Sequence, residues 1–305
     1  TIAASTNSRN DSPRLSAVMA VMEVFCFLRF GGAFGTLGTA AIMAPSQRAT
    51  AERSEEMCVA FALAALTEGG LVTMNHVPEA PQSASGDYAW LGAEPGSVAD
   101  QLYMSAADEW NQAINSRFVN ELLDDTLPES ILKSYLIQDF KFFNQGIMAH
   151  AIELAPRQET KDMLVKQSQW FADNEATYFT GFLKEYGITD EEYNNSERTP
   201  ANREYCEYLT KLVQGTWEEL ITALCCMEWI YLAWAKRTID AGVVQQIPAH
   251  KGWVDLHEGD YFRAWTGRLI ALVNEYASVD GSEADVFRTI VHLERRFFED
   301  SYPQQ

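Results

Sequence analysis

Three acidic residues lie in aromatic segments that have the residue spacing of helices. They are Asp139 in SYLIQDFKFF, Glu228 in CCMEWIYLAW and Glu294 in VHLERRFFEDSY. Burying a carboxylate among Phe, Tyr and Trp side chains is unfavourable unless the carboxylate is paired or hydrogen-bonded. A chain that does so three times is expected to build a polar site inside an apolar pocket. Such a site suits acid–base chemistry on a small, flat, polar molecule.

Asp139 borders the aromatic face of its helix, and Phe142 lies one turn further along the same side. Its carboxylate could bind the amidine-like edge of an aminopyrimidine while the Phe142 ring stacks on the base. The alternative is a surface aspartate near Lys133 or Lys141.

Glu228 lies in a segment that is apolar on every side, which indicates a buried helix. A desolvated carboxyl group has a raised pKa and suits general acid–base work near neutral pH. The alternative is a structural glutamate hydrogen-bonded to a tyrosine or an indole. Glu294 lies beside Phe297–Phe298, and its alternative is a surface acid neutralised by Arg295 and Arg296.

Tyr205 and Tyr208 share one helix face, and either could donate a phenolic hydrogen bond into a site. His257 lies in the short segment Trp253–Phe262, where a lone histidine is either structural or a hydrogen-bonding residue of the site.

The five cysteines are odd in number and show no CxxC spacing, so we expect reduced thiols in an intracellular protein. Cys225 and Cys226 lie in the middle of an apolar helix, whereas a nucleophilic cysteine needs a nearby base or a helix N-terminus. We therefore expect them to be inert. The five histidines form no pairs at i, i+3 or i, i+4, and no Glu-x-x-His repeat occurs, so no metal site is expected.

The 305 residues are 47% hydrophobic and carry a formal net charge of −20. A surface this acidic repels phosphate backbones, so nucleic acid is not an expected partner. No apolar run reaches the roughly 18 residues that a membrane helix needs, and no membrane partner is expected.

The N-terminal part has a different composition. Residues 1–50 contain arginine but no lysine and are rich in Ser, Thr and Ala, which is the profile of an organelle-targeting segment. An extra helix or a tail is the alternative. Residues 77–96 are rich in Pro, Gly, Ser and Ala and indicate a linker or surface loop. We therefore divide the chain into an extension, residues 1–96, and a helical domain, residues 97–305. The expected location is cytoplasmic, or an organelle if the extension is a presequence.

After the linker, the hydrophobic spacing predicts long helices and no strands. The expected helices are Ser97–Asn120, Pro128–Leu154, Thr160–Glu185, Ala201–Gln214, Trp217–Ala241, Trp253–His257, Asp260–Tyr276 and Ala284–Ser301. The predicted fold class is an all-α bundle.

From about Gln101 to Tyr302 the chain resembles the TenA / thiaminase II family. FVNELLDDTLPESILKSYLIQDFKFF resembles the opening stretch of that family, and TPANREYCEYL resembles its Pro-x-x-x-x-Tyr segment. GWVDLHEGDYF resembles the Trp-x-x-x-Tyr segment, and VHLERRFFEDSY resembles the C-terminal Glu segment. The resemblance implies a heme-oxygenase-like up-and-down helical bundle, here with an N-terminal extension.

The resemblance also implies roles for individual residues. Asp139 falls on the pyrimidine-binding aspartate and Phe142 on the ring position after it. Tyr205 falls on the pocket tyrosine, and Glu294 on the catalytic acid. His257 stands where many members have tyrosine.

One segment departs from the bacterial type of the family, which has a nucleophilic cysteine before Trp-x-Tyr. Aligning Trp229 and Tyr231 places Met227 at that position, one residue from Cys226. CCMEWIYLAW is instead similar to the glutamate subgroup, in which Glu228 would replace the cysteine.

The resemblance implies a hydrolase that acts on a thiamin-related aminopyrimidine in thiamin salvage. The candidate substrates are aminomethylpyrimidine, its N-formyl derivative and thiamin itself. Glu228 and Glu294 would catalyse the reaction, without a metal or an organic cofactor, in a homo-oligomer (a dimer or a tetramer). Two alternatives remain open: a non-catalytic pyrimidine-binding or regulatory protein, and a metal-dependent oxidase on the same scaffold.

Overall fold

The computed structural model describes residues 76–142 and 146–303, and within these ranges it contains helices and no strand. The targeting segment expected within residues 1–50 lies outside the described residues. The described helices are α3 (Val98–Ser105), α4 (Ala107–Ile114), α5 (Arg117–Leu123), α6 (Glu129–Phe140), α7 (Ile147–Leu154), α8 (Gln158–Trp170), α9 (Ala176–Glu185), α10 (Asp190–Asn195), α11 (Pro200–Leu212), α12 (Trp217–Ala241), α13 (Pro248–Leu256), α14 (Gly259–Tyr276) and α15 (Ser282–Glu299). Two short segments complete the set: the 3₁₀ turn η1 (Ala89–Leu91) and the π-helical segment η2 (Phe171–Glu175). The predicted all-α fold is confirmed.

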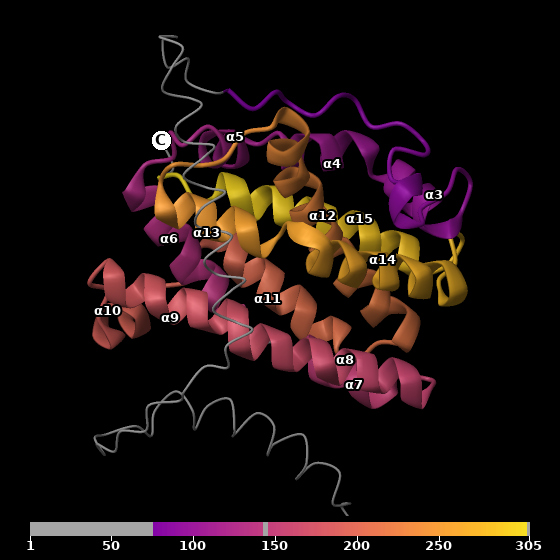
Figure 1. Cartoon of the computed structure of the whole chain (residues 1–305). Helices are drawn as coiled ribbons and strands as arrows, with labels where there is room; N and C mark the ends of the chain where they lie inside the picture. Colours follow the sequence, from indigo (N-terminus) through magenta and orange to yellow (C-terminus); the bar gives the residue numbers. More distant parts are fainter. Residues whose placement is uncertain (1–75, 143–145, 304–305) are drawn as a thin grey trace, which may run out of the picture. The chain divides into compact units, whose positions relative to one another are not determined.

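Helix α12 runs through the middle of the bundle, beside α14 and α15 (Figure 1). At its start, the Thr216 side chain accepts a hydrogen bond from the Glu219 amide, and the Glu219 carboxylate accepts one from the Thr216 amide. This capping box satisfies amides that have no partner within the helix. Gly242 ends the helix in the left-handed conformation, with φ 64°. Buried side chains lie on every side of α12, as its apolar sequence predicts.

The helix predicted over Ser97–Asn120 is three helices in the structure. Ser97 caps α3 by accepting a hydrogen bond from the Asp100 amide, as the spacing of these two residues indicates. Ser116 then caps α5 in the same way, through the amide of Val119. A serine that binds the backbone in this way offers the chain a new helix start in place of a continuous helix.

The helix predicted over Pro128–Leu154 is also interrupted. Helix α6 ends at Phe140, and α7 begins after Gly146, whose φ of 74° lies in the left-handed region. Glycine adopts this conformation without strain and so permits the break. The break leaves Phe142 outside either helix, and its ring contacts Tyr205 of α11.

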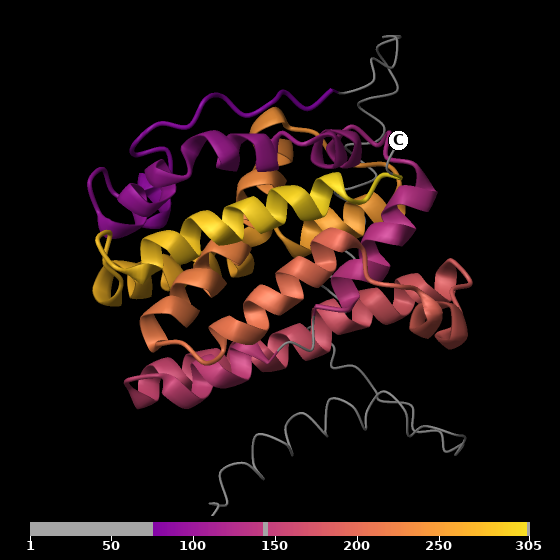
Figure 2. The same cartoon turned by 180° about the vertical axis from the view of Figure 1, so that it is seen from behind.

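The segment before α3 packs on the helices. The Val77 side chain is buried, and the Arg237 guanidinium of α12 donates hydrogen bonds to the carbonyl oxygens of Pro78 and Ile114. We call residues 76–88 the strap; it runs along one side of the bundle (Figure 2). The compact unit begins at Asn75, which places residues 77–96 with the helices.

Helices α8 and α9 follow one another through η2 as one long helical stretch along another side of the bundle (Figures 1 and 2). Within residues 76–142 and 146–303, no helix combines the length and the apolar character needed to cross a membrane.

Candidate functional site

Three helices that are distant in sequence bring the three predicted acids together. Asp139 lies near the end of α6, Glu228 in the middle of α12, and Glu294 on α15. Asp139 and Glu228 both lie close enough to Glu294 to raise its pKa. A fourth acid, Glu175 from η2, interacts in the same way with Asp139 and Glu228. We call these four residues the acid cluster.

Burial sets the pKa values of the two acids at the centre of the cluster. It raises the pKa of Asp139 to about 7, and the Tyr231 hydroxyl opposes the shift. It raises the pKa of Glu228 to about 8, where the indole of Trp265 opposes the shift. Loss of hydration disfavours the charged form of a carboxyl group. Both acids can therefore exchange protons near neutral pH.

Glu294 is the most deeply buried of the predicted acids, with 3% of its surface exposed. Burial raises its pKa to about 8, and the neighbouring acids add to the shift. The Tyr205 hydroxyl donates a 2.7 Å hydrogen bond to its Oε1 atom. The Phe142 ring meets Tyr205 edge-on, with 4.7 Å between ring centroids. The structure therefore brings these three predicted site residues into direct contact.

His257 lies at the end of α13 and is 6% exposed. Its Nδ1 atom is 2.8 Å from the carbonyl oxygen of Trp253. A carbonyl can only accept, so Nδ1 carries the proton and Nε2 is left as an acceptor. Burial lowers the pKa of His257 to about 4, which makes the imidazole neutral at physiological pH. Its ring packs on Tyr231, with 4.7 Å between centroids.

Two tyrosines that the sequence did not single out as site residues join these groups. The hydroxyls of Tyr135 on α6 and Tyr231 on α12 are 2.6 Å apart and hydrogen-bonded. Tyr231 also contacts His257 and interacts with Asp139. Tyr135 lies four positions before Asp139, and Tyr231 lies three positions after Glu228. Tyrosines one helical turn from each acid are therefore the sequence signal that could have identified them.

The basic residues that could have neutralised the acids bind other partners. Lys133 pairs with Glu129, and Lys141 donates to the Tyr193 carbonyl. Arg295 pairs with Glu109 and Glu299, and Arg296 pairs with Glu204. The structure therefore does not support the alternatives in which Asp139 and Glu294 are surface acids paired with these basic residues.

The two adjacent cysteines of α12 are fully buried. Burial raises the pKa of both thiols. The Cys226 thiol donates to the carbonyl oxygen of Phe287, at 3.7 Å. A neutral thiol that is bonded to the backbone is a poor nucleophile.

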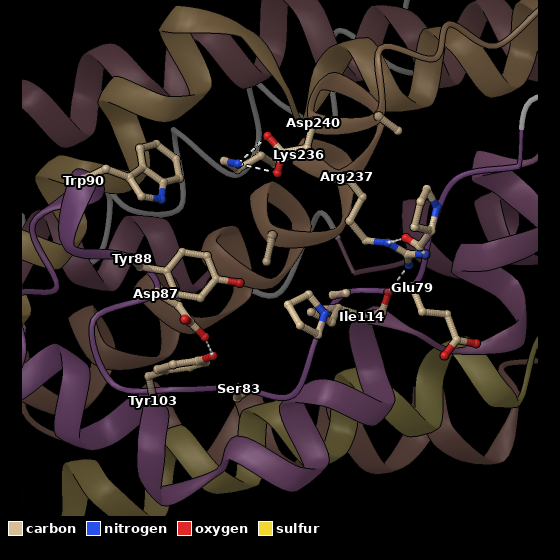
Figure 3. Close-up of a pocket in the computed structure, with 15 residues that line it drawn as sticks. Glu79, Ser83, Asp87, Tyr88, Trp90, Tyr103, Ile114, Lys236, Arg237 and Asp240 are labelled. Carbon is tan, nitrogen blue, oxygen red and sulfur yellow. Dashed lines mark hydrogen bonds and ion pairs between the residues drawn. The ribbon is translucent and has the colours of Figure 1, made fainter.

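A separate pocket of about 380 Å³ lies between residues 78–90 and the second half of α12 (Figure 3). Several polar groups of its lining bind one another: Asp87 accepts a hydrogen bond from the Tyr103 hydroxyl at 3.0 Å, and Lys236 pairs with Asp240. No member of the acid cluster lines this pocket. Among the described residues, no group of three or more His, Cys, Asp or Glu side chains is arranged to hold a metal ion.

Two curated proteins named aminopyrimidine aminohydrolase are similar to this chain. The protein from Helicobacter pylori is 23% identical over 218 residues, which cover 67% of this chain and 98% of that protein. The protein from Bacillus subtilis is 21% identical over 182 residues, which cover 59% of this chain and 76% of that protein.

Solved structures share the fold. A TenA homologue from P. horikoshii superposes with a TM-score of 0.60 at 23% identity and covers 67% of this chain and 98% of that protein. A TenA homologue from Pyrococcus furiosus gives a TM-score of 0.60 at 20% identity, covering 67% and 100%.

The sequence profile of the TENA/THI-4/PQQC family matches residues 104–303, which include Asp139, Glu175, Glu228 and Glu294. The resemblance inferred from the sequence is confirmed, and the chain belongs to the TENA/THI-4/PQQC family.

Proposed function

We propose that this protein hydrolyses a C–N bond in a thiamin-related aminopyrimidine, as part of thiamin salvage. The observation that supports this most is the acid cluster, in which three carboxyl groups have pKa values of about 7 to 8 beside aromatic rings. Acids whose pKa lies near the working pH are effective in proton transfer. The names of the two similar aminohydrolases agree with this chemistry.

Asp139 and Phe142 would bind the pyrimidine. An ionised carboxylate accepts charge-assisted hydrogen bonds from the ring amine and a protonated ring nitrogen. The Phe142 ring would stack on the flat base, held in place by its contacts with Tyr205 and Phe297 at 4.7 Å each. The acceptor Nε2 of His257 would take a further hydrogen bond from the substrate or from water.

Glu228 and Glu294 would carry the reaction. Both titrate near pH 8 and repel one another's charge, so the pair can hold one proton between them. The ionised member accepts a proton from water. The leaving nitrogen departs as a neutral amine, either because it already carries a proton in the substrate or because the protonated member donates one. The water oxygen bonds to the methylene carbon, the C–N bond breaks and the amine departs. With aminomethylpyrimidine and water as reactants, the products are hydroxymethylpyrimidine and ammonia. With the N-formyl derivative, water can instead cleave the formamide.

Mass spectrometry of the purified protein incubated with thiamin, aminomethylpyrimidine and formylaminomethylpyrimidine tests this function. We expect hydroxymethylpyrimidine to form from at least one of them. Tight binding without any product would identify a pyrimidine-binding or regulatory protein instead. Metal analysis of the same sample tests for the oxidase alternative.

We further propose a homo-oligomer, either a dimer or a tetramer, as the family resemblance implies; light scattering on the purified protein checks this. The reduced cysteines expected from the sequence favour an intracellular location, cytoplasmic or organellar. Imaging of a fluorescent fusion to the C-terminus distinguishes the two compartments.

A further inference from the structure

The long helical stretch α8–η2–α9 changes its packing partner at η2. Before η2, the Trp170 ring stacks on Tyr261 of α14 at 4.8 Å. After η2, the Phe179 ring stacks on Phe140 of α6 at 4.7 Å and meets Trp253 of α13 at 5.5 Å. A π-helical turn adds a residue and rotates the following side chains by about 100°, the angle that separates successive helix residues. One continuous stretch can thereby face two different neighbours.

Glu175 is the last residue of η2 and lies one turn before Phe179, on the same side of the helix. Phe179 packs on Phe140, the neighbour of Asp139. Glu175 therefore lies on the side of its helix that packs against α6, and it interacts electrostatically with Asp139 and Glu228.

Among residues 76–142 and 146–303, no side chain balances this carboxyl group. Glu175 is half-buried and makes no hydrogen bond or ion pair with another described residue. Two other acids with buried or half-buried side chains are paired: Glu109 binds His292 and Arg295, and Asp100 accepts three hydrogen bonds from residues 85–96. An unpaired, partly buried carboxyl group destabilises a fold, so a ligand is the natural partner for it.

The position of Glu175 defines which part of the substrate it meets. In the proposed function Asp139 holds the ring amine and Glu228 acts at the methylene carbon. The exocyclic nitrogen is bonded to that methylene carbon, so a carboxyl group that interacts with both acids lies within reach of it. We propose that Glu175 binds this exocyclic nitrogen and selects aminopyrimidines in which the nitrogen carries a positive charge.

This assignment rests on the proposed function and follows from charge. Burial and the neighbouring carboxyl groups raise the pKa of Glu175 well above its usual range. An ammonium group reverses that balance for Glu175, because a nearby positive charge favours the ionised form of a carboxyl group. A neutral substituent supplies no such compensation.

Two ligands that differ only at this nitrogen test the proposal. Aminomethylpyrimidine is a cation near neutral pH, and hydroxymethylpyrimidine is uncharged. In Glu175→Gln we expect kcat/KM for aminomethylpyrimidine to fall about 10- to 100-fold, the effect of losing a hydrogen bond to a charged group. The inhibition constant of hydroxymethylpyrimidine should stay near that of the unmodified protein.

Glu185→Gln is the matched control, because it removes the same charge from an exposed position on α9 and should change neither value. Glu175→Asp keeps the charge and should lose less than Glu175→Gln. Equal weakening of both ligands, or no change in either, with cooperative unfolding intact, would overturn the assignment of Glu175. If the unmodified protein neither cleaves nor binds either pyrimidine, the proposed function itself fails, which is a distinct result.

Discussion

At the scale of single residues, the site depends on carboxyl groups that the fold buries. Asp139, Glu228 and Glu294 are surrounded by aromatic side chains, and the nearby arginines and lysines bind other partners. Hydrogen bonds from tyrosine and tryptophan side chains oppose the burial-driven rise in the pKa of these acids only in part. The acids therefore keep pKa values of about 7 to 8, which a salt bridge would have lowered.

The raised pKa of Glu228 predicts how stability depends on pH. Burial raises this pKa from 4.5 to about 8, so the folded state binds the proton more tightly than the unfolded state. The stability that this proton contributes is complete below pH 4.5 and is lost as the pH rises through about 8. Glu228→Gln cannot ionise, so its Tm relative to the unmodified protein should increase over this pH range. Thermal unfolding at several pH values checks this, with the exposed Glu153→Gln as a control that should show no such trend.

The cysteines of α12 should be dispensable for catalysis. The Cys226 thiol is buried and bonded to a backbone carbonyl, and Glu228 is proposed to act in place of a nucleophile. Cys225→Ala and Cys226→Ala should each retain most of kcat in a steady-state assay. A fall of about 10²-fold or more for Cys226→Ala, the size expected for losing a key catalytic group, would return the chain to a cysteine mechanism.

At the scale of helices, local sequence signals account for some boundaries and tertiary packing for others. Helix α12 matches its prediction from Trp217 to Ala241, because a capping box and a glycine mark its ends. The serine cap at Ser116 was missed, because Trp110 and Phe118 on either side of it keep the apolar spacing of one helix. Tertiary packing overrides such spacing.

The residues of the candidate site, like the helix boundaries, could be predicted from the sequence only in part. The six predicted site residues come together, since each lies in a segment with its own helical and aromatic pattern. Glu175 was not predicted, although apolar residues at Phe171 and Phe179 flank it at four-residue spacing. The direction of its side chain depends on the π-helical turn of η2, which is stabilised by contacts of Trp170 and Phe179 with other helices.

At this scale, the hydrogen bonds between α12 and the strap predict a loss of stability when Arg237 is replaced. Arg237 is 6% exposed and binds the carbonyl groups of Pro78 and Ile114 together with the side-chain oxygen of Asn120. Arg237→Leu leaves these acceptors unpaired and should lower the free energy of unfolding by about 1–3 kcal/mol. Denaturant unfolding measures the change. The adjacent Lys236→Gln removes only a partly exposed ion pair and should change it by less than about 1 kcal/mol.

At the scale of the whole molecule, the acid cluster draws on α6, η2, α12 and α15, so the site forms only when the bundle is complete. The compact unit begins at Asn75, and the strap is tied to α12. A protein that lacks residues 1–75 should therefore keep cooperative unfolding and pyrimidine binding. Removal of residues 1–96 should lower the Tm, because it also takes away the partners of Arg237. Circular dichroism during heating distinguishes these two deletions. Loss of cooperative unfolding when only residues 1–75 are removed would show that they belong to the folding unit.

The central claim is that Glu228 transfers protons while Asp139 binds the pyrimidine, and one kinetic comparison tests it most directly. Steady-state turnover of aminomethylpyrimidine would be measured for Glu228→Gln and Asp139→Asn beside the unmodified protein. Glu228→Gln keeps the shape of the side chain but cannot exchange a proton, so kcat should fall about 10²- to 10⁴-fold with little change in KM. Asp139→Asn loses a charge-assisted hydrogen bond, so its main effect should be a higher KM. Equal, mild effects of both substitutions, below about 10²-fold, would mean that these carboxyl groups are structural and would contradict the account.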